Sequence, residues 1–139
     1  MNKYQYEWIE TEIGEVINDI GDGGTPNRNK SENFGGNIPW VVVQDIKWNI
    51  FNTKENLSDL GLKSSSTKLW SKGTVIISTG GTIGKVGIAK TPLCTKQGIH
   101  GIVCNEKYIL PEYLAYFLIS KKNKLNALSQ GSTIKEIRA

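Results

Sequence analysis

The chain has little of what disulfide scaffolds, metal sites and membrane spans require. It contains two cysteines and one histidine among 139 residues. Two cysteines are too few for a disulfide scaffold, so Cys94 and Cys104 are expected to be free, buried thiols, although they could also be neighbours on paired strands. A zinc site would need carboxylates to complete its ligands, and none is predicted. No apolar run approaches the ~20 residues of a membrane helix, and residues 1–12 lack the apolar core of a secretion signal, so we expect a cytoplasmic protein.

The residues that are present suit one soluble globular domain. Hydrophobic residues make up 38% of the chain and charged residues 22%. The net charge of +4 is unevenly distributed: residues 1–60 carry 5 Lys/Arg against 10 Asp/Glu, whereas residues 61–139 carry 12 Lys/Arg against 3 Asp/Glu. A basic second half suits a polyanionic partner, although surface lysines also serve solubility.

The stretch from Thr74 to Lys90 predicts two short apolar strands around a glycine-rich reversal. Two interpretations of the reversal are open: a hairpin whose glycines turn the chain, and a phosphate cradle. A nucleotide-binding P-loop needs G-x-x-x-x-G-K-[ST]. Thr79 stands where its first glycine should be, and Val86 stands where Ser or Thr should bind magnesium. The pattern therefore favours the hairpin.

Shorter patterns predict the remaining elements. The apolar residues between Ile13 and Ile20 follow helical spacing, and Gly21 is placed to end that helix. Residues 22–37 form a polar loop, which is either a flexible surface excursion or a segment that reaches a groove or a phosphate. The other predicted elements are a strand that begins at Ile38, a strand beside Trp48, a short helix near residues 58–62, a strand at 99–104 and a helix with Pro111 in its first turn.

The order of short motifs resembles one target-recognition domain of a type I restriction–modification specificity subunit. Each motif is weak alone, but their joint order covers nearly the whole chain. They are Trp8, Ile13-Gly14-Glu15-Val16, Gly24-Thr25-Pro26, Ile38-Pro39-Trp40, Asp45-Ile46, Gly61-Leu62, Ser64-Ser65, Gly73-Thr74-Val75, Gly81-Thr82-Ile83-Gly84-Lys85, Gln97-Gly98-Ile99, Pro111-Glu112-Tyr113-Leu114 and Gly131-Ser132-Thr133.

The resemblance implies an α+β fold, with a curved, mostly antiparallel sheet and short helices packed beside it. It implies a target-recognition domain over residues 1–130 and the start of a spacer-helix region over residues 131–139. Such domains read about half of a split sequence in double-stranded DNA and deliver it to methyltransferase and restriction subunits. The family usually carries two such domains, so a half-size subunit would be expected to pair with a second copy of itself.

Catalysis is expected to belong to those partners. The chain has no Asp/Asn-Pro-Pro-Tyr/Phe stretch of the kind found in adenine methyltransferases, and no paired carboxylates with a lysine at nuclease-like spacing. Its one histidine, His100, is not tied to a serine or cysteine nucleophile. We therefore predict no catalytic residue and no cofactor or metal in this chain, with S-adenosylmethionine, ATP and magnesium held by the partner subunits.

The resemblance does not name the base-reading residues, because they vary between family members, so the candidates rest on residue chemistry. Loops at 22–37, 44–47, 63–68 and 78–85 are rich in polar and basic side chains. Gln44 is the candidate for reading adenine. Arg28 and Lys30 are candidates for contact with either bases or phosphates, Lys68 and Lys85 would hold phosphates, and Lys47 is a further candidate for DNA contact. The alternative function is a protein-interaction decoy that binds methyltransferase subunits without reading DNA.

Overall fold

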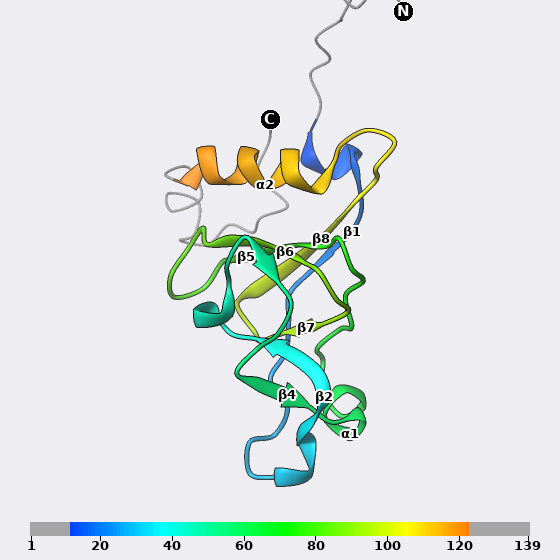
Figure 1. Cartoon of the computed structure of the whole chain (residues 1–139), viewed down its shortest axis with the longest axis vertical. Helices are drawn as coiled ribbons and strands as arrows, with labels where there is room; N and C mark the ends of the chain where they lie inside the picture. Colours follow the sequence, from blue (N-terminus) through cyan, green and yellow to red (C-terminus); the bar gives the residue numbers. More distant parts are fainter. Residues whose placement is uncertain (1–11, 123–139) are drawn as a thin grey trace, which may run out of the picture.

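The computed structural model describes residues 12–122, and its strands form two sheets (Figure 1). The larger sheet has five strands in the order β1 (Ile17–Gly21), β8 (Ile99–Cys104), β5 (Val75–Ser78), β6 (Val86–Ala89) and β3 (Asn49–Ile50). The smaller sheet has three, in the order β4 (Glu55–Leu57), β2 (Phe34–Val41) and β7 (Cys94–Thr95). The helices are α1 (Asp59–Lys63) and α2 (Pro111–Ser120), with 3₁₀ turns η2 (Ile13–Glu15), η3 (Ser31–Asn33) and η4 (Val43–Asp45).

The predicted α+β class is confirmed, with the strands divided between two sheets. Most pairings are antiparallel, and the exceptions within the described residues are β3 with β6 and β2 with β7. Helix α2 lies across one end of the molecule, while β2, β4 and α1 lie at the other (Figure 1). The predicted spacer-helix region, residues 131–139, lies outside the described residues.

Strand β5 shows how the core is divided. Val75 and Ile77 join the apolar cluster beneath α2, together with Leu114 and Leu118 of that helix. Ile76, whose side chain points the other way, joins a second cluster that includes Trp70 and Leu93. All four residues of β5 are buried, because both faces of this strand are covered.

The helix predicted between Ile13 and Ile20 is wrong beyond its first turn. Residues Ile13–Glu15 form η2, and residues Ile17–Gly21 form β1, which pairs antiparallel with β8. The pairing register shifts between Ile17 and Asp19. Such an irregularity resets the two-residue alternation of a strand. Ile17 and Ile20 consequently both pack against the apolar cluster beneath α2, which we call the α2-side cluster. They are three residues apart, and this spacing is the one expected for one face of a helix.

The central hairpin is confirmed. Strands β5 and β6 pair antiparallel, with Val75 opposite Ile88 and Ile77 opposite Val86. In the turn, Gly81 and Gly84 have φ angles of 64° and 85°, which favour glycine. Several N–H groups of the turn bond within the protein: Gly84 donates to the Ser78 carbonyl and Thr79 donates to the Gly98 carbonyl. These donors are therefore not directed outward as a phosphate cradle would need.

The predicted helices near residue 58 and at Pro111 are confirmed. The Ser58 hydroxyl accepts the Gly61 N–H at 3.1 Å and so starts α1, while Pro111 occupies the first turn of α2. The strand predicted from Ile38 begins earlier, at Phe34, and ends at Val41. The strand expected beside Trp48 is β3, which pairs with β6 in the larger sheet rather than with β2.

A close approach of two backbones depends on Gly87 in β6. A Cβ atom placed there would lie 2.1 Å from the backbone oxygen of Lys47 and 3.0 Å from Cδ1 of Ile50. The backbone before β3 would have to move away from the sheet to make room. The path of the chain through Lys47 is therefore fixed by the absence of a side chain at position 87.

We expect Gly87→Ala to destabilise the protein by about 1–3 kcal/mol, the usual cost of forcing atoms into a packed interior. Gly14→Ala is the matched control, because no atom lies within 4 Å of its added Cβ, and it should change stability by less than about 0.5 kcal/mol. Urea unfolding followed by tryptophan fluorescence measures both. Equal midpoints for the two variants would contradict the close approach.

Cys94 and Cys104 are free and buried, as predicted. Burial raises the pKa of the Cys94 thiol from 9.0 to about 12. Burial, with smaller contributions from the charges of Glu106 and Glu112, raises the pKa of Cys104 to about 11. The stabilising effect of these two protonated thiols is complete below pH 9 and is lost as the pH rises through the folded-state values.

We expect both thiols to react slowly with a disulfide reagent such as Ellman's reagent at pH 8, because the thiolate is the reactive form and burial suppresses it. In denaturant, where the thiols are exposed, the same reagent should react rapidly with both. The absorbance of the released thiolate gives the rates. Rapid reaction of the folded protein would show that one of the thiols is accessible.

Candidate functional site

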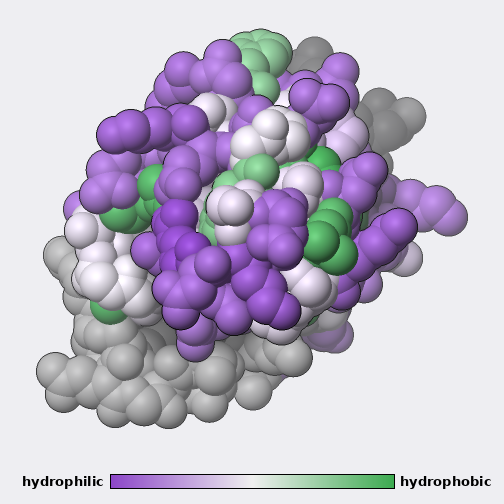
Figure 2. All heavy atoms as spheres, turned by 90° about the horizontal axis from the view of Figure 1, so that it is seen from below, coloured by the Kyte–Doolittle hydropathy of each residue, from purple (hydrophilic) through white to green (hydrophobic). Residues whose placement is uncertain are grey.

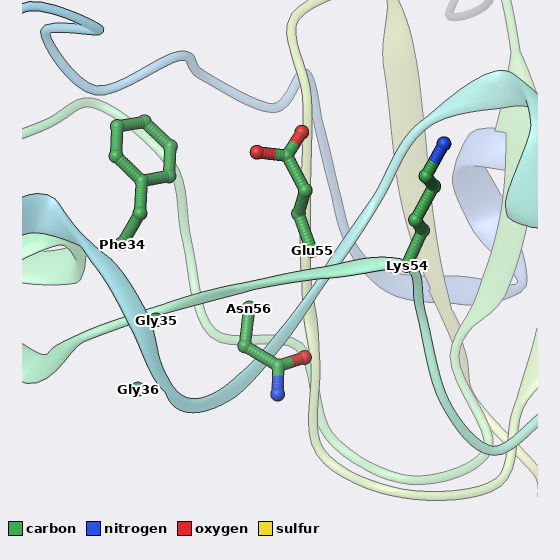
Figure 3. Close-up of a pocket in the computed structure, with 6 residues that line it drawn as sticks. All are labelled: Phe34, Gly35, Gly36, Lys54, Glu55 and Asn56. Atoms are coloured by element: carbon green, nitrogen blue, oxygen red, sulfur yellow. The ribbon is translucent and has the colours of Figure 1, made fainter. Parts of the chain in front are cut away.

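Two adjoining hollows lie over the smaller sheet, at the end of the molecule away from α2. One, of about 330 Å³, is drawn in Figure 3 and is lined by Phe34, Gly35, Gly36, Lys54, Glu55 and Asn56. The other, of about 590 Å³, we call the Arg28 hollow; it is lined by Arg28, Val42, Gln44, Asp45, Lys54, Glu55 and Lys96. Lys54 and Glu55 line both, so the two hollows share part of their walls.

The surface at this end of the molecule is polar. Figure 2 views the molecule from the end opposite α2 and shows a largely hydrophilic face with small apolar areas. The Arg28 hollow carries three basic and two acidic side chains. A mixed lining with a basic excess suits a polar, anionic ligand better than an apolar one.

Arg28 is held on two sides. Its Nη1 and Nη2 donate hydrogen bonds of 2.7 and 3.0 Å to the two carboxylate oxygens of Glu55. Its guanidinium carbon lies 4.9 Å from the centre of the Phe34 ring and 4.8 Å from that of Trp40. Planar stacking together with a two-pronged bond to a carboxylate is a geometry that lysine cannot reproduce. The orientation of the guanidinium is therefore set before any ligand arrives.

The ion pair shifts the proton affinities of both partners. The hydrogen bonds from Arg28 hold the pKa of the Glu55 carboxyl below its usual value. The same bonds raise the pKa of Arg28. The two side chains are 48% and 41% exposed, so water still reaches the pair and another polar group can compete for either partner.

Trp40 supports Arg28 from below and is itself fixed. Its side chain is completely buried, and its Nε1–H donates to the Gly24 carbonyl at 3.1 Å. Its backbone N–H donates to Oγ1 of Thr53, whose hydroxyl donates in turn to the Glu55 carbonyl at 2.7 Å. Trp40 and Glu55 are also register partners across β2 and β4. One buried ring thus joins the loop that carries Arg28 to the strand that carries Glu55.

The loop before β2 is tied down along its length. Gly24 donates its N–H to the Thr95 carbonyl at 2.9 Å. Asn33, which is 2% exposed, donates from Nδ2 to the Asn27 carbonyl, and its own carbonyl accepts the Ser58 N–H. These bonds attach the segment to β7 and to Ser58, the residue that precedes α1.

Gln44 is presented by η4 and also lines the Arg28 hollow. Asp45 fixes this turn: its carboxylate accepts the backbone N–H of Val42 at 2.9 Å and that of Lys54 at 3.1 Å. Gln44 is exposed, and within the described residues its amide makes no hydrogen bond. An amide with a free donor and acceptor on a fixed turn is available to a polar ligand.

The other predicted contacts lie at different distances from this site. Lys85 is connected to it, because its Nζ donates to the carbonyl of Val43 at 3.0 Å. Lys47 is exposed on the chain between η4 and β3, and Lys30 is exposed in the loop before η3. Lys68 is engaged elsewhere: it pairs with Asp19 of β1 and lies over the Trp70 ring. The structure thus brings Arg28 and Gln44 into one hollow with Lys85 beside its rim.

Sequence reasoning missed Glu55, Lys54, Lys96, Phe34 and Asn56. In Figure 3, Glu55 and Asn56 point to opposite sides of β4, and Phe34 extends on the same side as Glu55. Arg28 and Glu55 are 27 positions apart. Their meeting depends on the pairing of β2 with β4, and no local pattern in the sequence indicates that pairing. Within residues 12–122, no group of three or more His, Cys, Asp or Glu side chains could hold a metal ion, and no helix there is long and apolar enough to cross a membrane.

Comparison with known proteins gives a consistent result. The specificity subunit of the type I restriction enzyme MjaIX from Methanocaldococcus jannaschii is 32% identical over an alignment of 153 positions, which covers 98% of this chain and 35% of that protein. The specificity subunit of the type I restriction enzyme HindI from Haemophilus influenzae is 27% identical over 124 residues, which cover 85% of this chain and 27% of that one. The chain therefore spans about a third of the length of these relatives.

The fold is found in solved structures. The HsdS subunit from Thermoanaerobacter tengcongensis superposes with a TM-score of 0.74 over 94% of this chain and 31% of its own, at 20% identity. A structure titled for complex assembly and conformational transition of the type I R-M system gives a TM-score of 0.73 over 93% of this chain. A family model described as the type I restriction modification DNA specificity domain matches residues 5–139. The chain belongs to this family of type I restriction–modification specificity domains.

Proposed function

We propose that this chain reads a sequence in double-stranded DNA as a specificity component of a type I restriction–modification enzyme. The observation that carries the proposal is the Arg28 hollow, in which a stacked arginine and a free glutamine amide occupy one polar depression. Family membership supports the same role. Arginine pairs with guanine O6 and N7, and glutamine pairs with adenine N6 and N7, at the edges exposed in the major groove.

We propose separate roles for the remaining basic candidates. Lys30, Lys47 and Lys85 would neutralise phosphates, which positions a protein on the duplex without reading sequence. Lys68 would do so only after it leaves Asp19. Lys54 and Lys96 join them, because both line the Arg28 hollow. Release of counterions from these contacts would make affinity fall steeply as salt rises.

The partners and the chemistry belong to the same proposal. The bound DNA would be delivered to methyltransferase and restriction subunits, which carry out adenine methylation and cleavage. S-adenosylmethionine, ATP and magnesium would be held by those subunits. Since the chain spans about a third of its relatives' length, a second recognition unit would come from further chain or from a second copy.

The first test is selection of bound duplexes. The chain, mixed with its methyltransferase subunit and a random duplex library, should enrich one sequence that sequencing of the bound DNA reveals. The chain alone, supplied with S-adenosylmethionine, should transfer no methyl group to that sequence. Absence of enrichment in the presence of the partner would contradict DNA reading. Methylation by the chain alone would contradict the proposal that catalysis belongs to the partner subunits.

A pair of substitutions distinguishes base reading from phosphate contact. We expect Gln44→Ala to cost about 1–3 kcal/mol on the selected sequence and to relax preference at one position, because a pairing with one base is lost. Lys47→Ala should weaken binding to all duplexes alike and reduce the salt slope by about 1. Fluorescence anisotropy across a salt series measures both, and identical profiles for the two variants would contradict the assigned roles.

The alternative is a decoy that binds methyltransferase subunits without reading DNA. Affinity of the chain for the methyltransferase would then be independent of DNA, and no sequence would be enriched. Affinity for duplexes that falls steeply with salt, together with enrichment of one sequence, favours the reader over the decoy.

A further inference from the structure

We propose that Glu55 is a specificity-determining residue, which withholds the Arg28 guanidinium from the phosphates of unrelated DNA and leaves it available to a matching base edge. This inference rests on the proposed DNA-reading function. It concerns a residue that no motif of the sequence indicates. It is carried by the geometry of the ion pair, by the surroundings of the Glu55 carboxylate and by the way both partners are anchored.

The ion pair occupies the donors that DNA would use. A guanidinium has five N–H groups in a rigid plane, and it binds phosphate or guanine through a pair of them that point the same way. In Arg28, Nη1 and Nη2 are both directed at Glu55. An acceptor that approaches this side of Arg28 must displace the carboxylate or bind at another edge of the guanidinium.

Arg28 is also restricted in how it can leave Glu55. Its guanidinium carbon lies within 5 Å of the centres of two aromatic rings, Phe34 and Trp40. These rings are themselves in contact, with centroids 5.8 Å apart at 63°. Swinging away to a distant phosphate would forfeit the stacking as well as the ion pair. Arg28 is therefore positioned for an acceptor that comes to it, at the hollow.

Glu55 cannot follow Arg28, because its backbone is fixed. It stands opposite Trp40 in the β2–β4 pairing, and its carbonyl accepts from the Thr53 hydroxyl. Its carboxylate therefore remains in the hollow with that of Asp45. These two carboxylates offset part of the charge of Lys54 and Lys96, so a phosphate gains less from this hollow than the basic side chains alone would give it. A base edge carries no net charge, so the carboxylates oppose it less. A carboxylate can in addition accept from an amino group of a base, as glutamate does from cytosine N4.

The consequence is discrimination between two kinds of contact. On an unrelated duplex, Arg28 stays with Glu55 and adds little to affinity. On the matching duplex, a base edge enters the hollow, where it can accept hydrogen bonds from Arg28 and donate to the Glu55 carboxylate. Glu55 therefore acts through Arg28, as a positioning residue that lowers unspecific binding more than specific binding.

The test compares Glu55→Gln with the wild-type chain on two labelled duplexes, the selected sequence and a scrambled one. We expect the variant to bind the scrambled duplex roughly fivefold more tightly, on the scale of one released exposed ion pair, with a salt slope steeper by about 1. Affinity for the selected duplex should rise less, so the ratio of the two affinities should fall. Circular dichroism should show an unchanged fold, because the side chain is 41% exposed.

Three further variants isolate the mechanism. Glu32→Gln is the charge-matched control, because it removes one exposed negative charge from η3. Arg28 forms its ion pair with Glu55 and not with Glu32, so the effect of this control should be smaller and equal on both duplexes. Arg28→Gln combined with Glu55→Gln should abolish the gain, because no guanidinium is left to release. Glu55→Asp keeps the charge but shortens the side chain, and it should change the ratio in the same direction by less.

The outcomes separate this inference from the proposed function. If the wild-type chain enriches no sequence with its partner, both fail. If it enriches a sequence but Glu55→Gln behaves like Glu32→Gln, or binds the scrambled duplex more weakly than wild type, only the role of Glu55 is overturned. The role of Glu55 is supported if Glu55→Gln lowers the ratio of affinities for the selected and scrambled duplexes, and if adding Arg28→Gln removes that effect.

Discussion

The buried indole of Trp40 holds together the loop, the strand and the arginine that form the Arg28 hollow. Its nitrogen donates to the Gly24 carbonyl, its backbone is bonded through Thr53 to β4, and its ring lies beneath Arg28. Loop, strand and arginine therefore share one rigid support. Sites that discriminate between ligands need this kind of preorganisation, because a mobile side chain loses binding energy when it is ordered.

The two ends of the molecule differ in how much apolar surface they bury. The five-stranded sheet and α2 bury Val75, Ile77, Leu114 and Leu118 in one apolar cluster. The small sheet adds a cluster of only three fully buried residues, Trp40, Leu57 and Cys94. Burial of apolar surface is the main favourable term in folding, so the larger sheet contributes most of the stability. The small sheet can therefore carry exposed charges and an open depression.

Local sequence signals predicted the elements whose causes are local. β-Branched residues around a glycine-rich turn gave the hairpin of β5 and β6, and Pro111 marked the start of α2. The failure at β1 has a physical reason: an irregular register between Ile17 and Asp19 places Ile17 and Ile20 against the same cluster, which copies the period of a helix. Only the pairing with β8, some 80 residues later along the chain, decides between the two interpretations.

The candidate site divides in the same way. Residue chemistry pointed to Arg28 and Gln44, and both line one hollow. It could not indicate Glu55 or Phe34, since their places beside Arg28 follow from the β2–β4 pairing and from the stacking on Trp40. Residue chemistry also placed Lys68 among the candidates for DNA contact, whereas the Lys68 side chain pairs with Asp19 on β1. Long-range pairing, rather than side-chain type, decides which polar residues become neighbours.

The segments around the Arg28 hollow lie apart from the largest apolar cluster. Within the small sheet, β2 meets β7 through two register pairs, Trp40 with Cys94 and Val41 with Thr95. Residues of β2 before Trp40, together with β4 and the loop that carries Arg28, lie outside the α2-side cluster. Exposed side chains of these segments can therefore change without contact with the apolar cluster beneath α2. The exposed side chains around the Arg28 hollow can thus be replaced one at a time while the larger sheet and α2 stay the same.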